Sequence, residues 1–301
     1  AVLAVGAAVG IRALSSDGAE APQAAASPRA ISGDVRTADP CPLLDMGALG
    51  RFGGVAPSAG SSPSGCRADV TAPDGRPAQL TASFSRGIAV DGGSQQVGDL
   101  TVQRGRTGAG GGADARLCVH GVVLPDGNQV LLRAYSFTSG IAPCDLADAG
   151  LDSAVASLQR DGVRYDPNRN ADFSLARADA CQAVDAAALG RAGLGATPFP
   201  GFASWSCSWG TAENYASVSF GGTTRRTGIA GGEGPAIADR KSYVESELGS
   251  CSVTVAHREG AGPDDRLETV TTTVRVPGAQ QDRVCGAATD LATTAESRIP
   301  R

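Results

Sequence analysis

Eight cysteines are the residues of this chain best suited to chemistry, because a thiol can form a disulfide, bind a metal or attack a substrate. They are Cys41, Cys66, Cys118, Cys144, Cys181, Cys207, Cys251 and Cys285. No Cys-x-x-Cys occurs and the chain has only two histidines, so zinc-finger and zinc-ribbon spacings are absent. An even number of cysteines without metal spacing predicts disulfides. We expect neither a metal site nor a bound cofactor.

The cysteines follow an internal repeat. Residues 38–53 return 140 residues later as residues 178–193, with nine of sixteen positions identical, which indicates that one structural unit was duplicated. If each copy folds alone, its four cysteines allow three pairings. We favour first with second and third with fourth, because these closures are the most local. Each link would stabilise the fold by about 3 to 4 kcal/mol in the chain-entropy model.

Candidate catalytic groups are sparse. His120 aligns with Val253 of the second copy and is interpreted as a partly buried structural histidine, whereas His257 aligns near Leu124. No Gly-x-Ser-x-Gly elbow occurs that would expose a serine nucleophile. The glycine-rich residues 105–113 lead into a strand and carry no Lys-Ser/Thr, so they are interpreted as a loop and not as a phosphate site. We therefore expect no catalytic residues and a protein that is not an enzyme.

Two charged positions recur in both copies. Asp45 matches Asp185, and Arg51 matches Arg191. Paired carboxylates can perform acid–base chemistry, but these two lie in separate copies. An ion pair on a helix surface or a loop anchor is the favoured interpretation.

Both tryptophans of the chain flank one cysteine. Trp205 and Trp209 alternate with serines around Cys207, so a strand here places both indoles and the sulfur on one face. Packing on a disulfide is the favoured interpretation, and an aromatic ligand surface is the alternative.

The remaining pattern predicts an α+β fold. Period-two alternation over residues 79–85 and 215–220 predicts half-buried antiparallel strands. Helical spacing follows Cys144 and Cys285 and predicts a closing helix in each copy. Residues 236–248 look helical in isolation. The predicted fold is two tandem homologous domains, each an antiparallel sheet with N- and C-terminal helices packed on it.

The N-terminal helix of each copy has sequence signals at both ends. Asp39 is placed as an N-cap with Pro40 at the first helical position, and the helix is expected to end at Gly50. In the second copy, Asp179 with Gln182 forms a capping-box pattern.

Composition divides the chain into five segments. The apolar residues 1–11 are interpreted as the end of a signal peptide or of an N-terminal membrane anchor. Residues 12–35 have no apolar period and are predicted to be a flexible linker that packs on nothing. The first repeat domain then covers 36–160, a polar and turn-rich linker 161–172, and the second repeat domain 173–301.

Charge and compartment narrow the function. The formal net charge is −5 and no basic stripe exists, so nucleic acid is not an expected partner. Disulfides downstream of an export-like segment predict a location on the extracellular face of the cytoplasmic membrane or in the medium.

Three motifs together resemble a known family. Asp39-Pro40-Cys41 opens the folded region, Cys207-Ser208-Trp209 follows in the second copy, and a late cysteine opens each closing helix. This pattern resembles a family of exported actinobacterial proteins of unknown function, many of them lipid-anchored. The resemblance implies a cell-envelope protein and supplies no catalytic residues.

The leading hypothesis is a non-enzymatic, exported cell-envelope binding module. Its partner would be an envelope protein, a lipid or a wall component, bound in the cleft between the domains or on a sheet face, with the membrane reached through the N-terminal segment. An extracellular sensor domain and a hydrolase with a nonstandard site are the alternatives. A pocket that joins a histidine, a carboxylate and a hydroxyl would favour the hydrolase.

Peptide mapping under non-reducing conditions tests the disulfide hypothesis. We expect Cys41 linked to Cys66, Cys118 to Cys144, Cys181 to Cys207, and Cys251 to Cys285, because local closure lets each copy fold without the other. Any peptide that links a cysteine below residue 160 to one above it would contradict this pairing.

Overall fold

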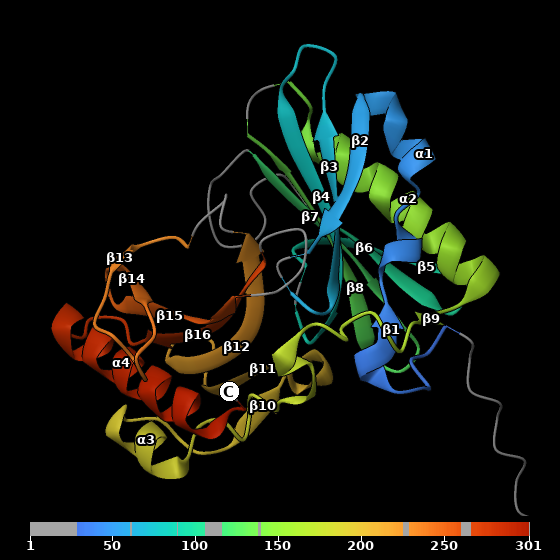
Figure 1. The fold of residues 1–301 in the computed structure, drawn as a ribbon. Helices are drawn as coiled ribbons and strands as arrows, with labels where there is room; N and C mark the ends of the chain where they lie inside the picture. The colour runs from blue at the N-terminus through green and yellow to red at the C-terminus, as the bar shows by residue number, and fades with distance from the viewer. Residues whose placement is uncertain are drawn as a thin grey trace, which may run out of the picture.

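The computed structural model describes residues 29–60, 62–88, 90–105, 116–137, 140–224, 229–259 and 266–300. Within these ranges the fold is mixed α+β, with two seven-stranded antiparallel sheets and one two-stranded sheet (Figure 1). The segment 1–11 and the first part of 12–35 lie outside the described residues.

The first sheet is built from residues 54–136. In spatial order its strands are β2 (Gly54–Ala59), β3 (Gly65–Thr71), β4 (Pro77–Arg86), β8 (Asn128–Ser136), β7 (Leu117–Val123), β6 (Leu100–Gly105) and β5 (Gly92–Val97). The strand predicted over 79–85 lies within β4. Its alternation buries Leu80 and Ala82 on one face and turns Thr81 and Ser83 to the other.

The second sheet is built from residues 198–275. In spatial order its strands are β10 (Pro198–Pro200), β11 (Ser206–Gly210), β12 (Tyr215–Thr224), β16 (Arg266–Arg275), β15 (Ser250–Glu259), β14 (Ser242–Glu247) and β13 (Gly232–Glu233). Taken along the chain, this is the strand order of the first sheet. The register agrees as well, because Cys66 lies opposite Ala82 in one sheet and Cys207 lies opposite Val218 in the other.

One long helix covers one face of each large sheet. Helix α2 (Pro143–Asp161) packs on β4, β7 and β8, and helix α4 (Gln281–Arg298) packs on β14, β15 and β16. In Figure 1 these helices lie on the outer sides of the two sheets, away from each other. Gly150 lets α2 approach closely, since a Cβ there would stand 2.7 Å from the Leu80 side chain. In the described part of the chain, neither long helix lies on the opposite faces of the two sheets.

The predicted N-terminal helices are shorter than expected. In place of one helix from Asp39 to Gly50, the chain forms a 3-10 turn (Cys41–Leu43) and then α1 (Met46–Leu49). The Asp39 carboxylate accepts a hydrogen bond from the Cys41 N–H, so it caps only the turn. Asp45 is the N-cap of α1, because it accepts from the N–H groups of residues 47 and 48 at 2.9 and 3.1 Å. A second capping residue ends the first turn and starts a new helix.

The second copy shows the same break. Asp179 accepts from the Cys181 N–H at 2.8 Å, and α3 (Ala186–Arg191) begins only after Asp185, which accepts from the Ala188 N–H at 2.8 Å. Both aspartates are N-caps, a role that the interpretation as surface ion pairs or loop anchors did not include, and Asp185 also forms the expected surface ion pair, with Arg298 at 3.5 Å.

The helical interpretation of residues 236–248 is wrong. Ala238 and Asp239 have φ of 51° and 63°, so the chain turns there in the left-handed region. Residues 242–247 then form β14, which pairs with β15 from Ser242 opposite Val255 onward. Strand pairing supplies backbone partners along the sheet that outweigh the local helical preference.

All eight cysteines lie within the described ranges and form four disulfides, with Cα separations of 5.0 to 5.1 Å. The pairs are Cys41–Cys66, Cys118–Cys144, Cys181–Cys207 and Cys251–Cys285, the pairing that the sequence favoured. Four disulfides indicate an oxidising compartment and an extracellular or secreted protein.

Residues 29–35 pack on the folded body, so the expectation that the whole segment 12–35 makes no contacts is wrong for this part. The Ile31 N–H donates to Asp126 at 2.8 Å, and the N–H groups of residues 32 and 33 donate to the Tyr165 hydroxyl at 3.0 and 3.2 Å. Strand β1 (Ala38–Asp39) pairs with β9 (Arg164–Tyr165). Polar backbone contacts hold this segment together with Ile31 and Val35, which pack against the core, and two apolar residues are too few to form a period in the sequence.

The connector 161–172 is docked by Arg169. Its guanidinium forms an ion pair with Asp39 and donates to the Gly65 carbonyl, and both charged side chains are mostly buried, at 14% and 18% exposed. A neighbouring residue, Asn170, reaches the carbonyls of Arg36 and Pro63 at 3.5 Å. The connector is thus fixed to the first half of the chain.

Removal of this buried cation should destabilise the protein. Arg169→Ala leaves Asp39 and the Gly65 carbonyl without their partner, and we expect the free energy of unfolding to fall by about 3 kcal/mol. Arg164→Ala is the control, because Arg164 forms an ion pair with Asp161 but is 57% exposed. That change should alter stability by less than about 0.5 kcal/mol. Chemical denaturation measures both, and equal effects would contradict the role of Arg169.

Candidate functional site

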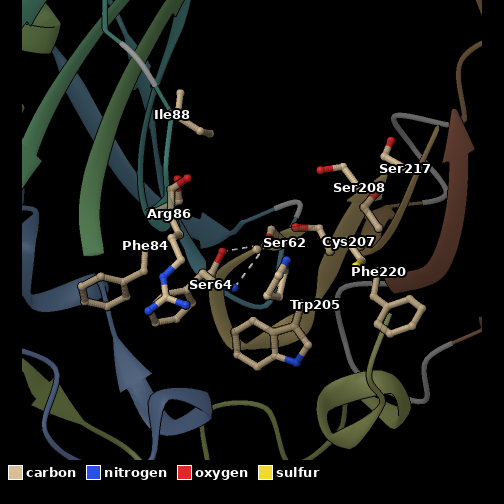
Figure 2. Close-up of a pocket in the computed structure, with 18 of the residues that line it drawn as sticks. Ser62, Ser64, Phe84, Arg86, Ile88, Trp205, Cys207, Ser208, Ser217 and Phe220 are labelled. Carbon is tan, nitrogen blue, oxygen red and sulfur yellow. Dashed lines mark hydrogen bonds between the residues drawn. The ribbon is translucent and has the colours of Figure 1, made fainter. Parts of the chain in front are cut away.

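A large hollow lies between the two seven-stranded sheets, on the faces that carry neither long helix. It is a groove of about 940 Å³ that receives side chains from β4 and β8 on one side and from β11, β12 and β16 on the other. Figure 2 shows Arg86 and Ile88 on one wall and Ser208 and Ser217 on the other, with Trp205 at the base. We call this hollow the inter-sheet groove.

Strand alternation fills the groove with hydroxyls. Ser83 and Ser85 flank the buried Phe84 on β4, and Ser219 precedes the buried Phe220 on β12, so alternation turns these serines into the groove while the two rings close its ends. The hydroxyl residues that line it are Ser62, Ser64, Ser83, Ser85, Ser206, Ser208, Ser217, Ser219, Thr269 and Thr271. Both sheets contribute to this set, so neither half of the chain makes the site alone.

Aromatic stacking holds the two halves together below the groove. The rings of Phe84 and Phe202 stack with centroids 5.2 Å apart and an interplanar angle of 23°, and Trp205 lies 6.2 Å from Phe202. The turn that presents Phe202 contains Ala203 and Ser204 with φ of 55° and 57°, a backbone region that non-glycine residues rarely adopt. A further link between the halves comes from Arg36, whose guanidinium donates to a carbonyl of the second half at 3.0 Å.

The two tryptophans are buried. Trp205 and Trp209 are 3% and 2% exposed, and the Trp205 indole N–H donates to the Ala176 carbonyl at 2.8 Å. Cys207 lies between them on β11 and is 1% exposed. The indoles pack around the disulfide strand and do not form an exposed aromatic surface. Phe199, at 56% exposed, is the most exposed of the aromatic side chains that line the groove.

Arginines are the only charged residues among those that the structure places on the groove wall. Arg86 lies at the end of β4 and Arg133 in the middle of β8, and the described lining contains no aspartate, glutamate or histidine. The Arg133 side chain is open to the groove, yet the surrounding walls partly desolvate it, and this desolvation lowers its pKa. Neither arginine is singled out by a sequence motif. The available signal was an arginine that follows directly on the apolar run 130–132 within a predicted strand.

His120 lies outside the groove, beneath α2. It is 2% exposed, its Nδ1 accepts from the Gly105 N–H at 3.0 Å, and its Nε2 stands 3.2 Å from an Asp148 carboxylate oxygen. Burial lowers the pKa of His120, while Asp148 opposes that shift. Arg104 pairs with the same aspartate. Of the glycine-rich residues 105–113, all that come after Gly105 lie outside the described residues.

His257 belongs to a second buried cluster. Its Nδ1 lies 3.1 Å from Glu296, which also pairs with Arg240, and the His257 and Glu296 side chains are fully buried. The structure does not bring His120 and His257 together. The other repeated charges are also apart: Arg51 stacks on Phe52, with 4.9 Å between the guanidinium carbon and the ring centroid, while Arg191 faces Asp290 at 3.9 Å.

The described residues contain no group of three or more His, Cys, Asp or Glu placed to hold a metal ion. No helix among them is long and apolar enough to span a membrane. Comparison with family models, with curated proteins and with solved structures finds no match for this chain.

Stability should depend on pH through His120. Because burial lowers its pKa in the folded state, the unfolded chain binds the proton more readily. We expect the free energy of unfolding to be highest above the ordinary histidine pKa of about 6.5 and to fall as pH drops below it. His120→Val, which places the valine of the matching position 253, should flatten this slope. Denaturation of both proteins at several pH values gives the slopes, and an unchanged slope in the variant would contradict the assignment.

Proposed function

We propose that this protein is a non-enzymatic, exported binding module of the cell envelope, and that the inter-sheet groove holds a saccharide component of the wall. One observation carries the proposal: the helix-free faces of both sheets converge and, together with Ser62 and Ser64 between β2 and β3, present ten Ser and Thr residues to one groove. The N-terminal segment would tether this module at the extracellular face of the membrane. Kinship with exported actinobacterial proteins belongs to the same proposal.

Hydroxyl side chains suit a ligand that is itself rich in hydroxyls. A serine or threonine hydroxyl donates one hydrogen bond and accepts others, as a sugar hydroxyl does. The strands hold these side chains at fixed spacing, so little conformational entropy is lost when a ligand binds. A volume of about 940 Å³ has room for several sugar rings. The described lining supplies binding groups without an acid–base pair of histidine and carboxylate.

We further propose that gene duplication made the groove, with repeat domains over 36–160 and 173–301 joined by the linker 161–172. The equal strand order, the matched cysteines and the repeated sixteen residues support this view. Two similar sheets that turn their helix-free faces toward each other create a site that one copy lacks.

A bulky side chain in the groove tests the function. We expect Ser217→Phe to weaken binding to immobilised wall polysaccharides at least tenfold, or about 1.4 kcal/mol, because the ring occupies ligand space. Ser252→Phe is the matched control: Ser252 lies on the same face of the same sheet but outside the groove, where it pairs with Thr273 at 2.9 Å. Biolayer interferometry measures both variants. Equal loss in the two, or no saccharide bound by the unmodified protein, would overturn the proposal.

A further inference from the structure

The inter-sheet groove carries positive charge in an acidic protein. The chain has a formal net charge of −5, yet the charged residues of the described lining are Arg86 and Arg133. Arg133 has no counterpart in the second sheet, where the matching position on β16 is Thr273. The charge is therefore a feature of one wall and not a consequence of the repeated fold.

The surroundings of Arg133 favour the binding of an anion. Among the described residues it has neither an ion pair nor a hydrogen-bond partner, and its side chain is exposed in the groove. The walls nevertheless desolvate it, which lowers its pKa. A partly desolvated guanidinium without a counter-charge gains more binding free energy from a carboxylate than a fully hydrated guanidinium does. Its parallel N–H groups can bind both oxygens of that carboxylate.

The spacing of the arginines indicates an elongated ligand. Arg133 lies opposite Thr81 on β4, and Arg86 follows five residues further along that strand. Their backbone positions are therefore roughly 16 Å apart, and because five is an odd number of residues, Arg86 starts from the other face of β4 and reaches the groove from the end of the strand. Two arginines at this distance can bind two acidic groups of one elongated ligand, but they are too far apart to bind the same small ion.

The groove favours a saccharide over an acidic peptide. An extended peptide binds sheets by adding a strand at an edge, but the groove walls are sheet faces, whose backbone groups are already paired within the sheet. The edge strand beside the groove, β10, has prolines at residues 198 and 200, which have no N–H to offer. Phe199 between them presents an exposed ring on which a sugar ring can stack.

We propose that the ligand of the inter-sheet groove is an acidic polysaccharide, with separate uronate carboxylates bound by Arg133 and Arg86 and the sugar hydroxyls bound by the serines. This inference rests on the proposed function and adds the charge of the ligand to it.

Binding to alginate, a polyuronate, compared with neutral dextran tests the charge. We expect alginate to bind at least tenfold more tightly than dextran, and Arg133→Gln to remove most of that difference. Added salt should weaken alginate binding, because it screens the ion pairs. Arg275→Gln is the control, because Arg275 is exposed on the face of β16 that carries Thr271 but lies outside the groove. This substitution should change the affinity for alginate less than twofold. Thermal unfolding of each variant verifies the fold.

The outcomes separate the two proposals. If dextran binds as tightly as alginate, and Ser217→Phe but not Arg133→Gln weakens it, the acidic ligand is overturned and the saccharide groove stands. If neither polymer binds, both are overturned. If polyglutamate binds more tightly than alginate and Arg133→Gln abolishes that binding, the groove binds an anionic ligand but the ligand is not a saccharide. Equal losses in Arg133→Gln and Arg275→Gln would also overturn the assignment of the charge to the groove.

Discussion

The stack of Phe202 on Phe84 is the contact on which the groove depends. It joins an aromatic ring from each half of the chain at 5.2 Å, and Trp205 supports it from the second half. The connector and the Arg36 hydrogen bond are further links between the two halves. Aromatic packing is insensitive to salt and buries a large area, so it fixes the angle between the sheets and with it the width of the groove. Placing Phe202 against Phe84 requires a turn in which Ala203 and Ser204 adopt positive φ, a backbone conformation that is strained for residues other than glycine.

In each sheet, one face packs against a helix and stabilises the fold, while the other face lines the groove. The face that packs on a helix contains Leu80, Leu132 and one cysteine of each disulfide, while the other carries mostly hydroxyls and, in the first sheet, Arg133. A sheet with only one covered face normally exposes the other to water, and the tolerance of that face for polar residues allows a site to form there. The disulfides contribute by tying each sheet to the segments around it, since Cys118 on β7 is joined to Cys144 on α2. Residues that bind can then change without disturbing the core.

Both histidines lie beside a carboxylate, but they are buried away from the groove. His120 and His257 each lie within hydrogen-bonding distance of a carboxylate, an arrangement that in an open cleft would suggest acid–base chemistry. Here both rings are packed beneath the long helices and away from the groove. Their carboxylates compensate the burial of a polar ring, which otherwise carries an energetic penalty.

The sequence by itself determined the strands, the closing helices and the cysteine pairs, because each depends on local patterns: alternation over residues 79–85, helical spacing after Cys144, and closures of 25 to 34 residues. It failed where partners are distant. Residues 242–247 became a strand only because β15 lies beside them, and residues 29–35 are held by Tyr165, more than 130 residues away. The groove belongs to this second kind. Serines on β4 and β12 look like ordinary exposed alternation in the sequence, and Arg133 looks like an isolated charge. Only the packing of one sheet against the other brings them to one surface, and that packing is decided by side-chain contacts that no local pattern records.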